Sequence, residues 1–146
     1  MQMKINLDKK LALVCASTRG LGYASALGLY KSGCSVILTG RTNEGLLEAK
    51  SKLSADVQAP VAGSKIHTMK VDLDNREDFN RFISNLADFP AIDILVTNSG
   101  GPAPGTFESF ANTLDFEEKC NQITFPAISL ISYVLDSMRE RNWGRI

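Results

Sequence analysis

The chain has 146 residues, the size of one domain, and its 44% hydrophobic and 22% charged residues exclude a disordered, collagen-like or coiled-coil chain. Sixteen basic residues balance sixteen acidic ones, and this zero net charge argues against nucleic acid as a partner. No apolar run approaches the ~20 residues of a membrane span, and the first residues lack the apolar centre of a signal peptide. We therefore expect a cytoplasmic protein with no membrane partner.

Three cysteines and one histidine offer little redox or metal chemistry. Cys15, Cys34 and Cys120 are odd in number, widely spaced and set among apolar or strand-like residues, so neither a disulfide framework nor a Cys-x-x-Cys metal site fits. We expect all three to be reduced and buried. His67 stands in a predicted strand without a Cys, Asp or Ser constellation, which favours a structural or surface role over catalysis or metal binding.

Four short apolar runs predict strands buried on both faces, and a stretch with helical spacing follows each of them. The strands are expected at Leu11–Ala16, Ser35–Thr39, Ile66–Val71 and Ile92–Thr97, and the helices at Gly20–Ser32, Asn43–Ala55, Arg76–Asp88 and Ser109–Arg141. This alternation predicts right-handed crossovers and the α/β class, in a single domain over 1–146. A fifth strand is expected to start near Trp143, so the sheet is expected to be incomplete on its C-terminal side.

The helix expected at 109–141 is apolar around more than one face. Val134 and Met138 belong to one apolar stripe, while Ile123 and Tyr133 extend the apolar surface around its side. Two alternatives remain open. The helix is either a core helix covered by further sequence or an interface between subunits.

A turn of small residues joins the first expected strand to the first expected helix, with the sequence Cys15-Ala16-Ser17-Thr18-Arg19-Gly20-Leu21-Gly22. Small residues let the backbone approach a pyrophosphate, whose charge is favoured by the free N–H groups and the dipole at a helix start. A tight strand-to-helix turn would by itself also explain the two glycines. The position of the turn in a strand–helix–strand series favours phosphate binding.

At this turn the sequence resembles the short-chain dehydrogenase/reductase family, whose classical members carry Thr-Gly-x-x-x-Gly-x-Gly there. The resemblance continues at Asp72 after the third strand, at Asn98-Ser99-Gly100 after the fourth and at Cys120-Asn121-Gln122 in the long helix, so it spans essentially the whole chain. It implies a Rossmann-type doubly wound parallel sheet with strand order 3-2-1-4. It also implies hydride transfer between a nicotinamide cofactor and a carbonyl or alcohol carbon.

Two departures from the family pattern indicate a variant subgroup. Cys15-Ala16 replaces the usual Thr-Gly, which puts a methyl group where a bare glycine is usual. This change can tighten the turn but need not abolish binding. Thr97-Asn98-Ser99-Gly100 replaces the usual Asn-Asn-Ala-Gly.

The residues around the second strand favour NADP(H) over NAD(H). An NAD site places Asp or Glu roughly 20 residues past the glycine turn, and here that place falls on Gly40. No carboxylate repels a 2′-phosphate, Arg41 and Arg19 offer positive charge to one, and Thr18 adds a hydroxyl. The alternative is that both arginines are solvated loop cations.

The resemblance implies further cofactor contacts. Asp72 is expected to hold the adenine amino group beside the backbone of Leu73, and Asn98, Ser99 and Gly100 to line the ribose side of the cleft. Asp72 could instead cap the following helix. The turn residues expected at the cofactor are Ala16, Ser17, Thr18, Arg19, Gly20, Leu21 and Gly22.

The resemblance assigns one of the family's catalytic roles to a residue of this sequence. Asn121 matches the helix asparagine that supports a proton-relay water, and its alternative is a buried polar residue satisfied by neighbouring backbone. Pro126 lacks the N–H that would bond the carbonyl of Gln122, so a kink beside Asn121 is expected.

The family's proton chemistry needs a Tyr followed by a Lys four residues later, and a Ser. Tyr23, Tyr30 and Tyr133 are followed at that spacing by Leu, Cys and Ser. The catalytic Ser, Tyr and Lys are therefore expected beyond Ile146, and these residues alone are expected to be inactive. The intact protein is expected to transfer hydride between NADP(H) and a small carbonyl or alcohol compound, for example as a 3-oxoacyl carrier-protein reductase. It is expected to be a homodimer or homotetramer joined through 109–141. The alternative is a non-catalytic module that binds a dinucleotide or masks a partner.

Overall fold

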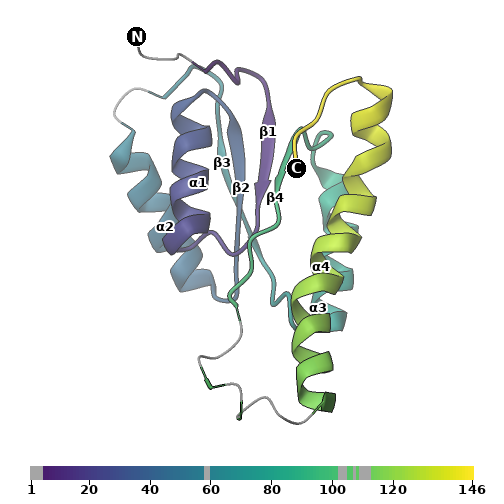
Figure 1. The fold of residues 1–146 in the computed structure, drawn as a ribbon. Helices are drawn as coiled ribbons and strands as arrows, with labels where there is room; N and C mark the ends of the chain where they lie inside the picture. The colour runs from purple at the N-terminus through teal and green to yellow at the C-terminus, as the bar shows by residue number, and fades with distance from the viewer. Residues whose placement is uncertain (1–4, 58–59, 102–104, 107, 109–112) are drawn as a thin grey trace.

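The computed structural model describes residues 5–57, 60–101, 105–106, 108 and 113–146. Its strands form one parallel sheet in the order β3-β2-β1-β4, which confirms the expected order. Helices α1 and α2 cover one face of the sheet and helices α3 and α4 the other (Figure 1). The elements are β1 (Leu11–Val14), α1 (Gly20–Lys31), β2 (Ser35–Gly40), α2 (Asn43–Asp56), β3 (Ile66–Lys70), α3 (Arg76–Asn85), a 3-10 turn η1 (Leu86–Asp88), β4 (Ile94–Val96) and α4 (Thr113–Glu140).

The central strand β1 shows why its sequence is continuously apolar. Leu11 and Leu13 pack into the core beneath α3 and α4, whereas Ala12 and Val14 pack into the core beneath α1 and α2. All four side chains are buried. A strand covered on both faces has no position left for a polar residue, so its sequence cannot alternate.

Several element ends differ from the expected ones. β1 ends at Val14 because the next residues turn away: Cys15 N still donates to Val96 O at 3.0 Å, but Ala16 has a left-handed backbone. β4 keeps only Ile94–Val96 of the expected strand. The helix expected over Arg76–Asp88 tightens into the 3-10 turn at its end, and the first residues expected in the long helix, 109–112, lie outside the described residues.

Side chains cap the N-termini of helices α2 and α3. Thr42 caps α2, since its hydroxyl accepts from Gly45 N at 3.2 Å, and Asn43 is the first helical residue. Asn75 caps α3 by accepting from Asp78 N at 2.9 Å. Both follow the preference of helix starts for short side chains that carry an oxygen.

The C-terminal half of α4 lies on the sheet, with Leu130, Val134 and Met138 buried in the core. Ile128 and Tyr133 of the same helix stay 57% and 39% exposed, so the apolar surface does extend around the helix. The helix runs through Pro126 as a single element. After α4, Arg145 forms a parallel bridge with Ile94, as a first step of the expected fifth strand.

One expectation for the cysteines is wrong. Cys15 and Cys34 are buried, but Cys120 lies on an exposed side of α4. His67 makes an edge-to-face contact with Phe89, and burial and the charges of Lys65 and Lys50 lower its pKa. Among the described helices, none combines the length and the apolar character that crossing a membrane requires.

Candidate functional site

The turn between β1 and α1 bends through two left-handed residues. Ala16 has φ +45° and Gly20 has φ +59°. A left-handed backbone is easy for glycine and strained for residues with a β-carbon. This explains why glycine is usual at this position and makes the backbone of Ala16 strained.

Gly22 is a glycine because the start of α1 lies against the turn. A β-carbon built on Gly22 would lie 2.3 Å from Ala16 O and 2.9 Å from Asn98 Nδ2, closer than real atoms approach. Asn98, two residues after β4, donates from Nδ2 to Ala16 O at 3.2 Å and to Cys15 O at 3.3 Å. The structure thus brings together the turn and the asparagine that the sequence predicted separately.

Ser17 shapes the turn from inside. It is fully buried, its hydroxyl donates to Val14 O at 2.8 Å, and it accepts from Thr39 N at 2.9 Å. Ser17 N also donates to Thr39 O at 2.9 Å, and Ala16 N to Thr39 Oγ1 at 3.0 Å. A side chain with these internal partners positions the backbone and does not face a ligand. Sequence reasoning missed Thr39, whose polar side chain in an apolar strand was the available signal.

The first turn of α1 presents free donors. Arg19 is its N-cap residue, and no side chain in the described part of the chain caps the helix there. Its first turn holds no acidic residue, and Leu21 leaves its side chain 82% exposed. Free N–H groups and the positive end of the helix dipole favour an anion at this place. The turn therefore fits the diphosphate of a dinucleotide.

The loop after β2 lies beside this turn. Gly40, the last residue of β2, is buried, and a β-carbon on it would lie 2.5 Å from Thr18 Cγ2, so Thr18 of the turn packs directly against Gly40. Arg19 and Arg41 are exposed, and within the described residues neither forms an ion pair. Two guanidinium groups and no carboxylate on these loops leave the positive charge free for a phosphate.

The contacts in the loop after β3 decide whether Asp72 caps the following helix. This half-buried carboxylate accepts from Asp74 N at 3.2 Å, and its own backbone N–H donates to Asp78 Oδ2 at 2.7 Å. Asn75, not Asp72, caps α3. The interpretation of Asp72 as a helix cap is therefore wrong.

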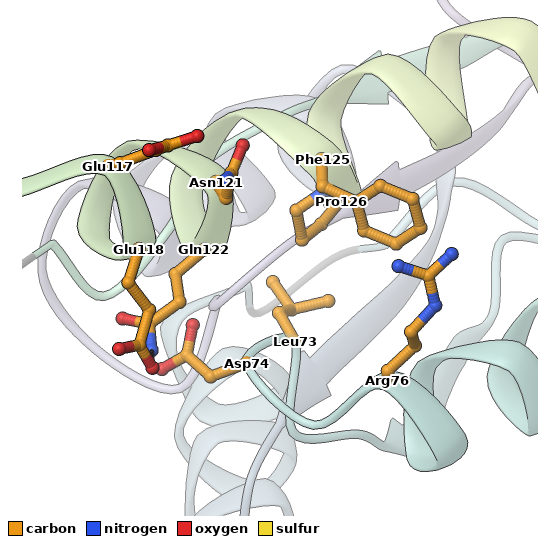
Figure 2. Close-up of a pocket in the computed structure, with 9 residues that line it drawn as sticks. All are labelled: Leu73, Asp74, Arg76, Glu117, Glu118, Asn121, Gln122, Phe125 and Pro126. Atoms are coloured by element: carbon orange, nitrogen blue, oxygen red, sulfur yellow. Dashed lines mark hydrogen bonds between the residues drawn. The ribbon is translucent and has the colours of Figure 1, made fainter. Parts of the chain in front are cut away.

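A hollow of about 730 Å³ lies between this loop and α4 (Figure 2). Asn121 lines it and is exposed, so the interpretation as a buried polar residue is wrong. In Figure 2, Glu117 and Asn121 stand on one side of α4, while Glu118 and Gln122 point toward Asp74. The lining residues are Leu73, Asp74, Arg76, Glu117, Glu118, Asn121, Gln122, Phe125 and Pro126.

The wall of this hollow contains a contact that the sequence did not predict. The Arg76 guanidinium lies 4.6 Å from the centre of the Phe125 ring, and Phe125 also contacts Phe79 edge to face at 5.7 Å. These contacts join α3 to α4. No local pattern signals them, because the residues come from helices far apart in the sequence.

A smaller hollow of about 30 Å³ lies between the loop after β4 and α4. Ser99 and Gly100 line it together with Gly101, Asp74, Lys119, Gln122 and Ile123. It shares Asp74 and Gln122 with the larger hollow, so the two adjoin. Among the described residues, those of the glycine turn line neither hollow.

A parallel sheet with helices on both faces and a glycine turn before its first helix defines an α/β domain of the Rossmann type. The sequence model of the family described as short chain dehydrogenase matches residues 10–146. The chain belongs to this short-chain dehydrogenase family.

Similar proteins agree with this assignment. The 3-oxoacyl-[acyl-carrier-protein] reductase FabG of Aquifex aeolicus is 35% identical over 147 residues, which cover 99% of this chain and 56% of that protein. The uncharacterized oxidoreductase YvrD of Bacillus subtilis is 31% identical over 150 residues, 99% of this chain and 52% of that protein. The chain thus spans about half the length of these curated relatives.

A solved structure shares the fold. L-sorbose reductase from Gluconobacter frateurii, complexed with NADPH and L-sorbose, matches with a TM-score of 0.75 and 25% identity. The match covers 95% of this chain and 51% of that one. The structural similarity extends over nearly all of the present chain, so the two proteins share this fold throughout it.

Proposed function

We propose that the protein containing this chain is an NADP(H)-dependent oxidoreductase acting on a small carbonyl or alcohol compound, and that residues 1–146 form its NADP-binding Rossmann domain. The bound cofactor supplies or accepts the hydride. The observation that carries the proposal is the start of α1, which no side chain of the described residues caps and which follows the left-handed turn at Ala16 and Gly20. This arrangement offers backbone donors to an anion where the chain can approach it closely.

The proposed contacts use the predicted residues. Backbone groups from Arg19 to Gly22 hold the diphosphate, with Ala16, Ser17, Thr18 and Leu21 completing the turn. The adenine lies at Asp72 and Leu73, and the ribose side is lined by Asn98, Ser99 and Gly100. Arg19 and Arg41 hold the 2′-phosphate, since both are exposed and, in the described part of the chain, unpaired with acids. The NADPH complex of the 25% identical L-sorbose reductase supports the choice of NADP(H).

The catalytic part of the proposal involves a single residue of this chain. Asn121 supports a proton-relay water, and its exposed position beside the larger hollow leaves room for one. The 146 residues contain no Tyr-x-x-x-Lys, so we propose that they do not turn over substrate alone. A 3-oxoacyl carrier-protein thioester is the proposed substrate, supported by the 35% identity to FabG. We further propose a cytoplasmic homo-oligomer joined through α4.

The deciding experiment measures dissociation constants for NADPH and NADH in the full-length protein and in its Arg41→Ala variant. Loss of a guanidinium–phosphate contact is expected to weaken NADPH binding by about tenfold or more, because hydrogen bonds to charged groups contribute ~1.5–3 kcal/mol. NADH lacks the 2′-phosphate, so its dissociation constant should change by less than about twofold.

Arg139→Ala is the matched control. Arg139 is also an exposed arginine, but it belongs to the last turn of α4, which lies at the opposite end of the strands from the glycine turn (Figure 1). Its substitution should leave both constants unchanged. An Arg41→Ala variant that loses no affinity for NADPH relative to NADH would refute the assignment of the 2′-phosphate site.

A further inference from the structure

The space beside Gly40 is filled by a side chain from the glycine turn. A β-carbon built on Gly40 would lie 2.5 Å from Thr18 Cγ2 and 3.5 Å from Leu46 Cδ2. The Leu46 contact is an ordinary one, but the Thr18 contact is shorter than packed atoms allow. Any residue other than glycine at position 40 therefore requires Thr18 or the backbone to move.

The backbone at position 40 is held on both sides. Gly40 is paired with Lys70 in β3, and its carbonyl accepts from Val71 N at 2.9 Å. The preceding Thr39 exchanges two hydrogen bonds with Ser17, both 2.9 Å long. Moving this strand end would break buried hydrogen bonds, so Thr18 is the part that has to give way.

Thr18 has little freedom to do so. Its β-carbon carries two heavy atoms, so two of the three staggered positions are filled in every rotamer. Thr18 Cγ2 also lies 3.8 Å from the place where a β-carbon on Gly45 would stand, so the first turn of α2 lies close to the same methyl group. A serine at position 18 has one heavy atom fewer and can turn it away from position 40.

We propose that Thr18 is a specificity-determining residue that keeps position 40 free of a carboxylate. The inference rests on the proposed function, in which position 40 is where an NAD-binding chain would place its acidic residue. Thr18 acts as a positioning residue: its methyl group occupies the space that a carboxylate side chain at position 40 would need. Such a carboxylate would bind the ribose hydroxyls of NADH and repel the 2′-phosphate of NADPH. Changing cofactor preference therefore requires substitutions at both positions.

The test compares Gly40→Asp with Thr18→Ser/Gly40→Asp in the full-length protein, by NADPH and NADH dissociation constants. Gly40→Asp alone is expected to weaken both cofactors by about tenfold, because overpacking distorts the turn. The double variant is expected to bind NADH within about threefold of the unmodified protein while NADPH binding stays about tenfold weaker. Thr42→Ser/Gly40→Asp is the control: it removes a methyl group that is not among the three atoms nearest to a β-carbon at position 40, and it should behave like Gly40→Asp.

A second readout does not depend on the cofactor. Gly40→Ala should lower the unfolding temperature, and Thr18→Ser/Gly40→Ala should recover part of the loss. Independent, additive effects of the two substitutions, on unfolding temperature and on NADH affinity alike, would overturn this inference while leaving the proposed function intact. An unmodified protein that binds neither dinucleotide would overturn the proposed function, and the role of Thr18 in specificity with it.

Discussion

Two glycines that look alike in the sequence of α1 have opposite physical roles. Gly22 lies where a β-carbon would meet the backbone of Ala16 at 2.3 Å. Beyond the neighbouring residues and backbone of α1 itself, no atom of the described residues lies within 4 Å of a β-carbon on Gly28. Both are helical, so neither is needed for its backbone angles. Gly22 is required by the close approach of the helix to the turn, and Gly28 is not required by packing.

Substituting these glycines by alanine should therefore change stability in opposite directions. Gly22→Ala is expected to destabilise the protein by about 1–3 kcal/mol through overpacking and to weaken NADPH binding by deforming the turn. Gly28→Ala should stabilise it by about 0.5–1 kcal/mol, because alanine loses less backbone entropy in a helix. Urea unfolding with titration of NADPH measures both effects, and equal stabilities for the two variants would contradict the structure.

At the scale of elements, a buried carboxylate fastens the end of α4 to the sheet. Asp93 is 6% exposed, accepts from Leu11 N at 2.9 Å and is paired with Arg141, while Lys10 Nζ lies 3.6 Å away. Arg141 also donates to Ile92 O at 2.8 Å. The contact joins β1, the approach to β4 and the residue that follows α4, so it fixes where the long helix ends on the sheet.

Arg141→Met should reveal this role. Removing the guanidinium leaves the Asp93 carboxylate with fewer partners, so we expect a loss of about 1–3 kcal/mol in the free energy of unfolding, since Lys10 remains and Arg141 is partly exposed. Arg139→Met is the matched control, because Arg139 and Asp136 form an exposed pair two residues away. Its effect should stay below about 1 kcal/mol in the same urea titration. A larger effect at Arg139 would refute the assignment.

At the scale of the whole molecule, the sheet separates two cores that each contain one cysteine. Cys15 belongs to the core under α3 and α4, and Cys34 to the core under α1 and α2. Burial raises the pKa of Cys15 to about 12, and burial together with the Asp93 charge raises that of Cys34 to about 12. Both groups stay protonated at neutral pH and react poorly, since the thiolate is the nucleophile.

Thiol labelling at pH 8 can therefore test the prediction of one cooperative domain. Exposed Cys120 should react in the native protein, whereas Cys15 and Cys34 should react only on unfolding. If residues 1–146 unfold as one unit, the two buried thiols should become reactive at the same urea concentration. Two separate midpoints in mass-spectrometric labelling would show that the cores unfold independently.

The sequence by itself determined the α/β class, the strand order that the resemblance implied and the approximate positions of the elements, because buried strands, helical spacing and turn residues are local patterns. It also predicted the glycine turn and Asn98. It did not predict that Asn98 would tie the turn to β4, since the partners are 82 and 83 residues apart in the chain.

Only the tertiary structure decided which polar side chains face inward and which face outward. Ser17 is buried against Thr39, 22 residues away, whereas Asn121 and Cys120 are exposed on α4. Thr18 and Gly40 share one space only because the ends of β1 and β2 lie side by side in the sheet. Burial and contact of this kind depend on how elements pack, and residues distant in the chain carry no local sign of it.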